Sequence, residues 1–285
     1  MNFGVHFHAF GEYADPHLLV ELSRVAEDAG WDGVFISDHL TASSERGAEA
    51  VLNPWITLAA IATATRRVRL GPMVAAVPRR RPWQLASEAV TLDHLSGGRV
   101  VLGVGSGISL ERSFAPFGEE MTLRRRAAML DEGLEVVTGL WRGEPYRFHG
   151  RHYRVETVTF LPRPLQRPRI PIWVAGHWPF PKPFQRAARW DGMFVDVEGV
   201  DWRRGEIVPP DALRECVRFT LAARREAGPF EVVIGGFSPH DPALAAARLA
   251  PYAGTGLTWW VEGIHQDFGS PEVTRARLQR GPPRP

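Results

Sequence analysis

An acidic residue and an imidazole close one short apolar stretch of the chain. Asp38 and His39 directly follow the run Val34–Ser37, which comes after a helical pattern and a glycine and so predicts a strand buried on both faces. In parallel α/β proteins the carboxyl ends of such strands hold the catalytic groups. We therefore interpret the pair as candidate catalytic residues. The alternative, in which Asp38 caps a turn and His39 is a solvated loop residue, fits this stretch equally well.

Two further histidines near the N-terminus could bind a metal ion. His6 and His8 lie two residues apart on a predicted strand, so their side chains point to the same side. A metal-dependent hydrolase barrel could add His177, but it would also need a bridging lysine or glutamate on the fourth strand and a histidine on the sixth. Those strands end in glycines and in Asp196. Polar lining of a barrel mouth is therefore the favoured role of His6 and His8.

Glycines gather after the fourth predicted strand. The segment Gly103-Val104-Gly105-Ser106-Gly107 has a glycine at every second position, which lets backbone N–H groups approach an anion or a flat ring closely. The dinucleotide pattern G-x-G-x-x-G is not met, and a tight turn is the alternative explanation. Gly176 and Gly235-Gly236 stand at the ends of two more predicted strands. Together these glycines favour a large ligand that lies across the ends of the strands.

The composition narrows the classes of function. Of the 285 residues 44% are hydrophobic, enough for a sizeable core, and the net charge of +2 argues against a nucleic-acid partner. Lys182, the only lysine, lies in a proline-flanked loop, which argues against a Schiff-base enzyme and a P-loop. Cys216 is the only cysteine, so we expect no disulfide and a reducing compartment. Without a signal-peptide pattern or a stretch of membrane length, a cytoplasmic protein is expected.

Strand-like and helix-like segments alternate along the whole chain. An N-cap residue followed by proline marks several helix starts, as at Asp15-Pro16, Asn53-Pro54 and Asp241-Pro242. Strands are expected at residues 2–7, 34–37, 68–70, 100–102, 170–175, 193–197, 230–234 and 257–261. This alternation predicts an α/β fold, a (βα)8 TIM barrel that spans residues 1–285 as a single domain, with a doubly wound sheet as the alternative. Residues 143–169 predict a small hairpin insertion between strands four and five.

Several motifs in a fixed order resemble the luciferase-like monooxygenase superfamily. They are Trp31-Asp32-Gly33 with Ser37-Asp38-His39, Leu70-Gly71-Pro72, Leu95–Arg99 followed by Leu102–Gly107, Phe148–Tyr153, Pro168–Gly176 and Arg186–Gly192. The resemblance covers residues 1–195 closely and the remainder loosely. The order of the motifs, rather than any one of them, identifies the family.

The resemblance implies a barrel that binds the deazaflavin coenzyme F420, with FMN as the alternative. The expected function is hydride transfer between F420 and a small, apolar organic substrate. An FMN-dependent monooxygenase is the alternative function, and a non-catalytic flavin-binding barrel and a metal-dependent hydrolase are more remote ones. The expected partner is a small-molecule substrate, without nucleic acid or membrane, and self-association into a homo-oligomer is a further expectation.

The resemblance also implies which residues form the site. His39 and Asp38 match a strand-two pair of deazaflavin-dependent members, in which the histidine lies beside the hydride-carrying carbon. A non-proline cis peptide is expected at Met73–Val74. The implied cofactor-binding residues are Asp38, His39, Met73, Val74, Ala76, Gly105, Ser106, Gly107, Glu111, Val174, Ala175, Gly176 and His177. The expected substrate pocket contains His6, His8, Trp178, Trp259 and Glu262.

One position departs from the family pattern. Deazaflavin dehydrogenases that act on alcohols or sugar phosphates often have a glutamate after the glycines of strand four. Ile108 stands at that position here, and Glu111 is the nearest acid. The loops after the last two strands also lack an evident basic cluster. Both observations argue against oxidation of a phosphorylated sugar.

Overall fold

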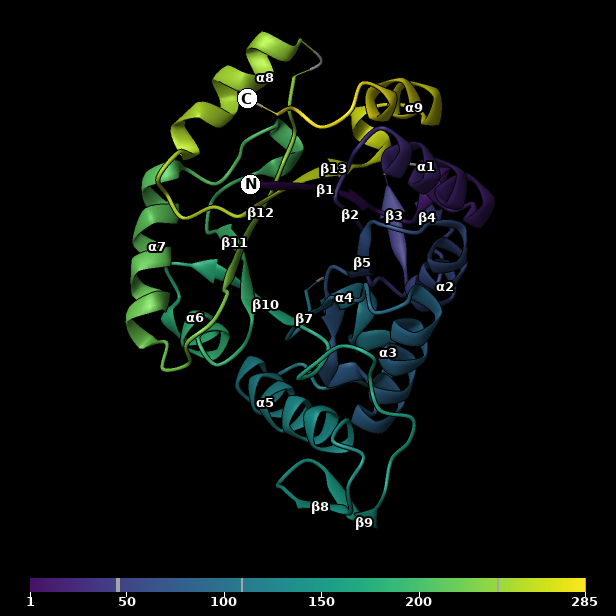
Figure 1. The fold of residues 1–285 in the computed structure, drawn as a ribbon, viewed down its shortest axis with the longest axis vertical. Coiled ribbons are helices and arrows are strands. Elements are labelled where there is room, and N and C mark those ends of the chain that lie inside the picture. The colour runs from purple at the N-terminus through teal and green to yellow at the C-terminus, as the bar shows by residue number, and fades with distance from the viewer. Residues whose placement is uncertain (45–46, 109, 240, 285) are drawn as a thin grey trace.

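A parallel sheet lies at the centre of the protein (Figure 1). The computed structural model describes residues 1–44, 47–108, 110–239 and 241–284. The strands of this sheet are Asn2–Phe7 (β1), Gly33–Ile36 (β2), Arg69–Pro72 (β5), Ala75–Ala76 (β6), Leu102–Gly105 (β7), Ile172–Trp178 (β10), Gly192–Val197 (β11), Glu231–Gly236 (β12) and Trp259–Ile264 (β13). They pair in the order β5, β2, β1, β13, β12, β11, β10, β7 and β6.

The two ends of the sheet meet at β7. β6 pairs with β7 through Ala75 and Ala76, and the backbone N–H of Val101 donates to the carbonyl of Leu70 in β5 at 2.9 Å. β5 and β6 are therefore two parts of one barrel strand, and the nine strands close into an eight-membered barrel. The predicted α/β barrel is confirmed.

Helices surround the barrel on its outer side (Figure 1). The main ones are Pro16–Asp28 (α1), Pro54–Ala64 (α2), Pro82–Ser96 (α3), Leu123–Leu140 (α5), Pro181–Ala187 (α6), Pro210–Ala223 (α7), Pro242–Leu249 (α8) and Pro271–Gln279 (α9), with a single short turn at Leu110–Ser113 (α4). The predicted caps are present, because Asp15 accepts from His17 N–H and Asn53 accepts from Trp55 N–H. Among the described residues, no helix combines the length and the apolar composition that crossing a bilayer requires.

Some boundaries differ from the predicted ones. β7, β10 and β13 each begin two residues later than expected. Before β7 and β10, Val100, Val101 and Ile170 are buried in the core without belonging to a named strand. α7 ends at Ala223, short of the predicted Ala227, where Arg224 takes an extended conformation and donates to the carbonyl of Trp190.

Two hairpins lie outside the barrel. Tyr146–His149 (β8) and Arg154–Val158 (β9) pair antiparallel in the segment between β7 and β10, and they project beyond α5 in Figure 1. Ala42–Ser44 (β3) and Gly47–Glu49 (β4) form a second antiparallel pair directly after β2. This second pair stands beside the carboxyl end of β2, where Asp38 and His39 lie.

Large side chains fill the interior of the barrel toward the amino ends of its strands. We call this cluster the aromatic plug; it consists of Phe35, Met73, Val101, Trp173, Val233, Trp259 and Val261. The Trp173 ring lies 5.4 Å from that of Trp259 and 5.6 Å from that of Phe35. A Cβ at Gly33 would lie 2.9 Å from both Phe35 and Trp259, so the glycine makes room for these rings. The aromatic plug therefore fills the barrel below the carboxyl ends of the strands.

Closure of the barrel depends on a glycine in β5. A Cβ at Gly71 would lie 1.8 Å from the carbonyl oxygen of Val101, so we expect Gly71→Ala to lower the free energy of unfolding by about 3 kcal/mol. Gly235→Ala is the matched control, because a Cβ there meets its nearest atom, in Phe194, at 3.7 Å; a change below about 1 kcal/mol is expected. Urea unfolding followed by circular dichroism measures both, and equal losses would contradict the close approach.

Candidate functional site

A cavity of about 1970 Å³ opens at the carboxyl ends of the barrel strands. Sites for small ligands usually have volumes of roughly 300–1,000 Å³, so this one has room for a cofactor and a substrate together. Met73 and Val261 of the aromatic plug form part of its floor. Inward positions at the upper ends of the strands hold small residues or imidazoles, and this leaves the space open.

Imidazoles line one side of this cavity. His39 follows β2, His6 lies on β1 and His8 comes directly after that strand, with 4.5 Å between the rings of His6 and His8. Burial and the neighbouring His39 lower the pKa of His6 to about 3, against a hydrogen bond with the Met73 backbone that raises it. Burial also lowers the pKa of His39, as do Arg79 and His265, while Asp38 raises it. Both rings are therefore mainly uncharged near neutral pH.

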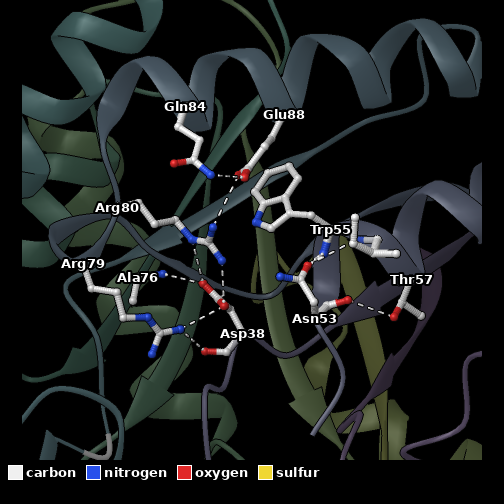
Figure 2. Close-up of polar contacts among 10 residues, drawn as sticks. Asp38, Asn53, Trp55, Thr57, Ala76, Arg79, Arg80, Gln84 and Glu88 are labelled. Atoms are coloured by element: carbon white, nitrogen blue, oxygen red, sulfur yellow. Dashed lines mark hydrogen bonds and ion pairs between the residues drawn. The ribbon is translucent and has the colours of Figure 1, made fainter. Parts of the chain in front are cut away.

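The carboxylate of Asp38 is bound by two arginines (Figure 2). Its Oδ1 lies 2.8 Å from Arg79 Nη2 and 2.9 Å from Arg80 Nη2, and its Oδ2 accepts from Ala76 N–H at 3.3 Å. Burial alone would raise the pKa of Asp38, but Arg80 and Arg79 hold it below its usual value. These contacts join the end of β2 to the segment after β6. Asp38 thus holds these two segments together, and its catalytic role stays a prediction.

Arginine also fixes the glycine-rich loop. Arg126 Nη1 donates to the carbonyls of Ser106 at 2.6 Å and Gly107 at 2.8 Å, and its guanidinium lies 5.3 Å from the centre of the Phe114 ring. Gly107 has a φ of 91°, and a Cβ there would lie 2.2 Å from Phe114. Only glycine fits this position, as the tight-turn alternative predicts, and the approach of a ligand to the loop stays a prediction.

Positive charge is concentrated in one half of the cavity. The cationic residues that line it are Arg79, Arg112, Arg124, Lys182 and Arg186, on the segments after β6, β7 and β10 and on α5. Arg79 pairs with Asp38, and Arg186 pairs with Asp131 at 2.8 Å. The remaining cations give this half a positive excess that favours an anionic group. In the sequence, the runs of adjacent arginines at 79–81 and 124–126 are the pattern that indicates this positive charge.

Comparison with known proteins assigns the family. Residues 1–253 match the family model described as luciferase-like monooxygenase. The chain belongs to that family. The F420-dependent glucose-6-phosphate dehydrogenase of Gordonia bronchialis is 30% identical over 275 residues, which are 94% of this chain and 78% of that protein. The enzyme of the same name from Nakamurella multipartita is 36% identical over 176 residues, 61% of this chain, and the match spans only 50% of its own length.

Solved structures share the fold of this luciferase-like protein. An F420-dependent secondary alcohol dehydrogenase in complex with an F420-acetone adduct superposes with a TM-score of 0.81 at 17% identity, covering 99% of this chain and 98% of its own. The monooxygenase RslO1 from Streptomyces bottropensis gives a TM-score of 0.77 at 22% identity, covering 98% of each chain. At this level of identity the similarity concerns the fold alone.

Most of the predicted site residues of the luciferase-like protein line the cavity. They are His6, His8, Asp38, His39, Met73, Val74, Ala76, Gly105, Ser106, Gly107, Ala175, Gly176 and His177. The peptide bond between Met73 and Val74 is cis, as the resemblance implied. Among the described residues, no group of three or more His, Cys, Asp or Glu side chains could hold a metal ion.

The two residues predicted on β13 lie outside the cavity. Trp259 points into the barrel but sits low, within the aromatic plug. Glu262 points outward, accepts from Trp260 Nε1 at 3.0 Å and from Ser238 N–H at 2.8 Å, and lies 3.3 Å from Arg277. Their predicted placement in the substrate pocket was wrong. Side chains alternate along a strand, so Glu262 points outward, and an inward residue such as Trp259 can lie deep in the barrel, below the cavity.

Three further predicted residues lie outside it as well. Val174 is fully buried on the outer face of β10, in the main core. Trp178 packs against Phe184 and Phe219, with ring centres 5.7 and 5.5 Å away. Glu111 lies on the exposed turn α4, where its neighbour Arg112 faces the cavity instead. All three are close in sequence to residues that line the cavity, but their own side chains point away from it.

The Asp38 cluster gives a prediction about stability. Arg79 has a side chain only 4% exposed, so Asp38→Asn would leave its buried charge without an acidic partner, and we expect a loss of about 3 kcal/mol in the free energy of unfolding near neutral pH. Because the pKa of Asp38 is lower in the folded chain, its contribution is complete above about pH 4 and is lost as the pH falls through the folded-state pKa. The gap between wild type and variant should therefore narrow in acid.

Urea unfolding over a pH series measures that gap. The control is Asp211→Asn, which removes an exposed partner of Arg214 and should change stability by less than about 0.5 kcal/mol. A gap that does not depend on pH, or one no larger than that of the control, would show that the ion pairs contribute little.

Proposed function

We propose that this protein is an F420-dependent oxidoreductase that exchanges a hydride between F420 and a small organic substrate. The observation that carries the proposal is a cavity at the carboxyl ends of the barrel that combines an uncharged imidazole, His39, with a half rich in arginine. F420 consists of a flat deazaflavin ring and an anionic tail, which match these two features. Relatives that are 30% to 36% identical and bear the name F420-dependent glucose-6-phosphate dehydrogenase support the choice of cofactor.

The residues present fit such a cofactor. Gly105 lines the cavity beside Val74 and has no side chain that would project into the space for a flat ring. Arg112, Arg124 and Lys182 are the residues that would hold the anionic tail. When bound, F420 supplies the carbon that accepts or donates the hydride.

His39 is the residue that would move the proton paired with the hydride. An uncharged imidazole can accept the hydroxyl proton of an alcohol that is being oxidised, and in the reverse direction the imidazolium returns it. Burial most of all, and then Arg79 and His265, lower the pKa of His39 against Asp38, which raises it, so the charged form is disfavoured. Phe10 holds the ring edge-on, at a distance of 5.7 Å between ring centres, and shields that side of it.

The proposal predicts which cofactor binds and where. We expect F420 to bind at least about tenfold more tightly than FMN, because its tail carries additional carboxylates toward the cationic half. Arg124→Gln combined with Lys182→Gln should weaken F420 binding about tenfold and reduce its dependence on salt. Titration followed by F420 fluorescence gives the dissociation constants. Arg24→Gln, an exposed change on α1, is the control, and tighter binding of FMN would favour the monooxygenase alternative.

The role of His39 is tested by kinetics. His39→Ala should slow the transfer of hydride from secondary alcohols to F420 about 100-fold, while the dissociation constant of F420 changes little. In the wild type the rate should be constant at neutral and higher pH and fall only at a pH below the ordinary imidazole pKa of about 6.5, because burial lowers the pKa of His39 and its protonation removes the base. The loss of F420 absorbance follows the rate. His149→Ala, on the external hairpin, is the control, and an unchanged rate in His39→Ala would exclude this role.

A further inference from the structure

The second half of the cavity has the opposite charge. We call it the acidic half: the lining residues contributed by β1, β11, β12, β13 and the segments that follow them. Its charged members are Asp196, Glu198, Glu206 and Asp267, and among the described lining residues of this half there is no lysine or arginine. Asp196 lies 3.6 Å from His177, at the border with the cationic half. Every cationic residue that lines the cavity belongs to that other half.

Aromatic rings form a continuous wall within the acidic half. We call Phe10, Trp202, Phe237 and His265 the aromatic wall. Its ring centres lie 5.0 Å apart between Phe10 and His265, 5.4 Å between His265 and Trp202, and 6.3 Å between Trp202 and Phe237. His8 stacks on Trp202 at 5.4 Å with an angle of 10° between the ring planes. These four side chains come from segments after β1, β11, β12 and β13, and all of them face the cavity.

The aromatic wall leads directly to the proposed proton-transfer residue. Phe10, at one end of the wall, meets His39 edge-on at 5.7 Å. A flat molecule seated on the wall would therefore lie next to the imidazole of His39. The acidic residues line the same half, and the described lining residues of this half include no lysine or arginine.

We propose that the acidic half is a substrate site for a planar aromatic compound that carries no negative charge, seated on Trp202, and that it rejects phosphorylated sugars. The inference rests on the proposed function, because it leaves the cationic half to F420. Stacked and edge-on rings bind a flat apolar surface with defined geometry. A phosphate group in this half would face four carboxylates, and the described lining residues there offer it no lysine or arginine, which opposes its binding. Relatives named for glucose-6-phosphate would thus differ from this protein in substrate.

One ring system in three charge states tests the proposal. The probes are naphthylmethanol, naphthylmethylammonium and naphthoate, titrated calorimetrically into F420-loaded protein. We expect naphthoate to bind at least about tenfold more weakly than the neutral alcohol, and the ammonium to bind at least as tightly as the alcohol. Glucose-6-phosphate should show no binding. Naphthoate binding as tightly as the alcohol, or binding of glucose-6-phosphate, would overturn the proposal.

Variants locate the probe within the cavity. Trp202→Ala should weaken the neutral alcohol about tenfold, whereas Glu206→Gln combined with Asp267→Asn should bring naphthoate to within about threefold of the alcohol. Glu21→Gln, an exposed charge change on α1, is the matched control and should leave all three constants unchanged. Unaltered binding in Trp202→Ala would place the aromatic ligand elsewhere and would refute the proposed seat.

The outcomes separate this inference from the proposed function. If F420 binds but the three probes do not follow the expected order, the inference fails and the F420 assignment stands. If F420 does not bind, the same titrations are made with the protein alone. If the three probes then bind in the expected order of affinity, and Trp202→Ala weakens the neutral alcohol, the aromatic site stands although the cofactor assignment fails.

Discussion

The filling of the barrel interior is the constraint on which the site depends. Eight strands turn every second side chain toward a common axis, and these side chains must pack without voids at one end while leaving space at the other. Three aromatic rings, Phe35, Trp173 and Trp259, occupy the end near the amino termini of the strands. Glycine at positions such as Gly33 lets those rings approach the wall. The cavity exists because the same inward series continues upward with glycines, alanines and imidazoles.

Arginine side chains hold the rim of this cavity together. Arg79 and Arg80 link the end of β2 to the segment after β6 through Asp38, and Arg126 links α5 to the loop after β7. Outside the cavity, Arg99 donates to the carbonyls of Ala62 and Val68. The planar guanidinium offers several donors in fixed directions, so one side chain can join several backbone segments in a way that lysine cannot. In this chain, which has one lysine, arginine therefore makes the charged contacts that join backbone segments.

The charged residues that line the cavity are divided between a cationic half and an acidic half. Acidic side chains in the cationic half are used in ion pairs, as Asp131 is with Arg186, whereas the acidic half has carboxylates and aromatic rings together. An anionic ligand and a neutral aromatic ligand would therefore take opposite places across the barrel mouth. His39, between the aromatic wall and Arg79, stands where the two would meet.

The sequence by itself determined the barrel, the capped starts of its helices, the family, the position of the cis peptide and the placement of His39 at a strand end. The barrel, the helix starts and the position of His39 follow from local patterns of apolar residues and prolines, whereas the family and the cis peptide come from the resemblance of short motifs to a known family; neither requires knowledge of distant contacts. Only the tertiary structure decided that Trp202 lines the cavity while Trp259 fills the plug, and that Asp38 is bound by arginines 41 and 42 residues further along the chain. The depth of an inward residue depends on the relative register of eight strands, and ion-pair partners depend on which loops meet at the rim, so neither is encoded in any single stretch.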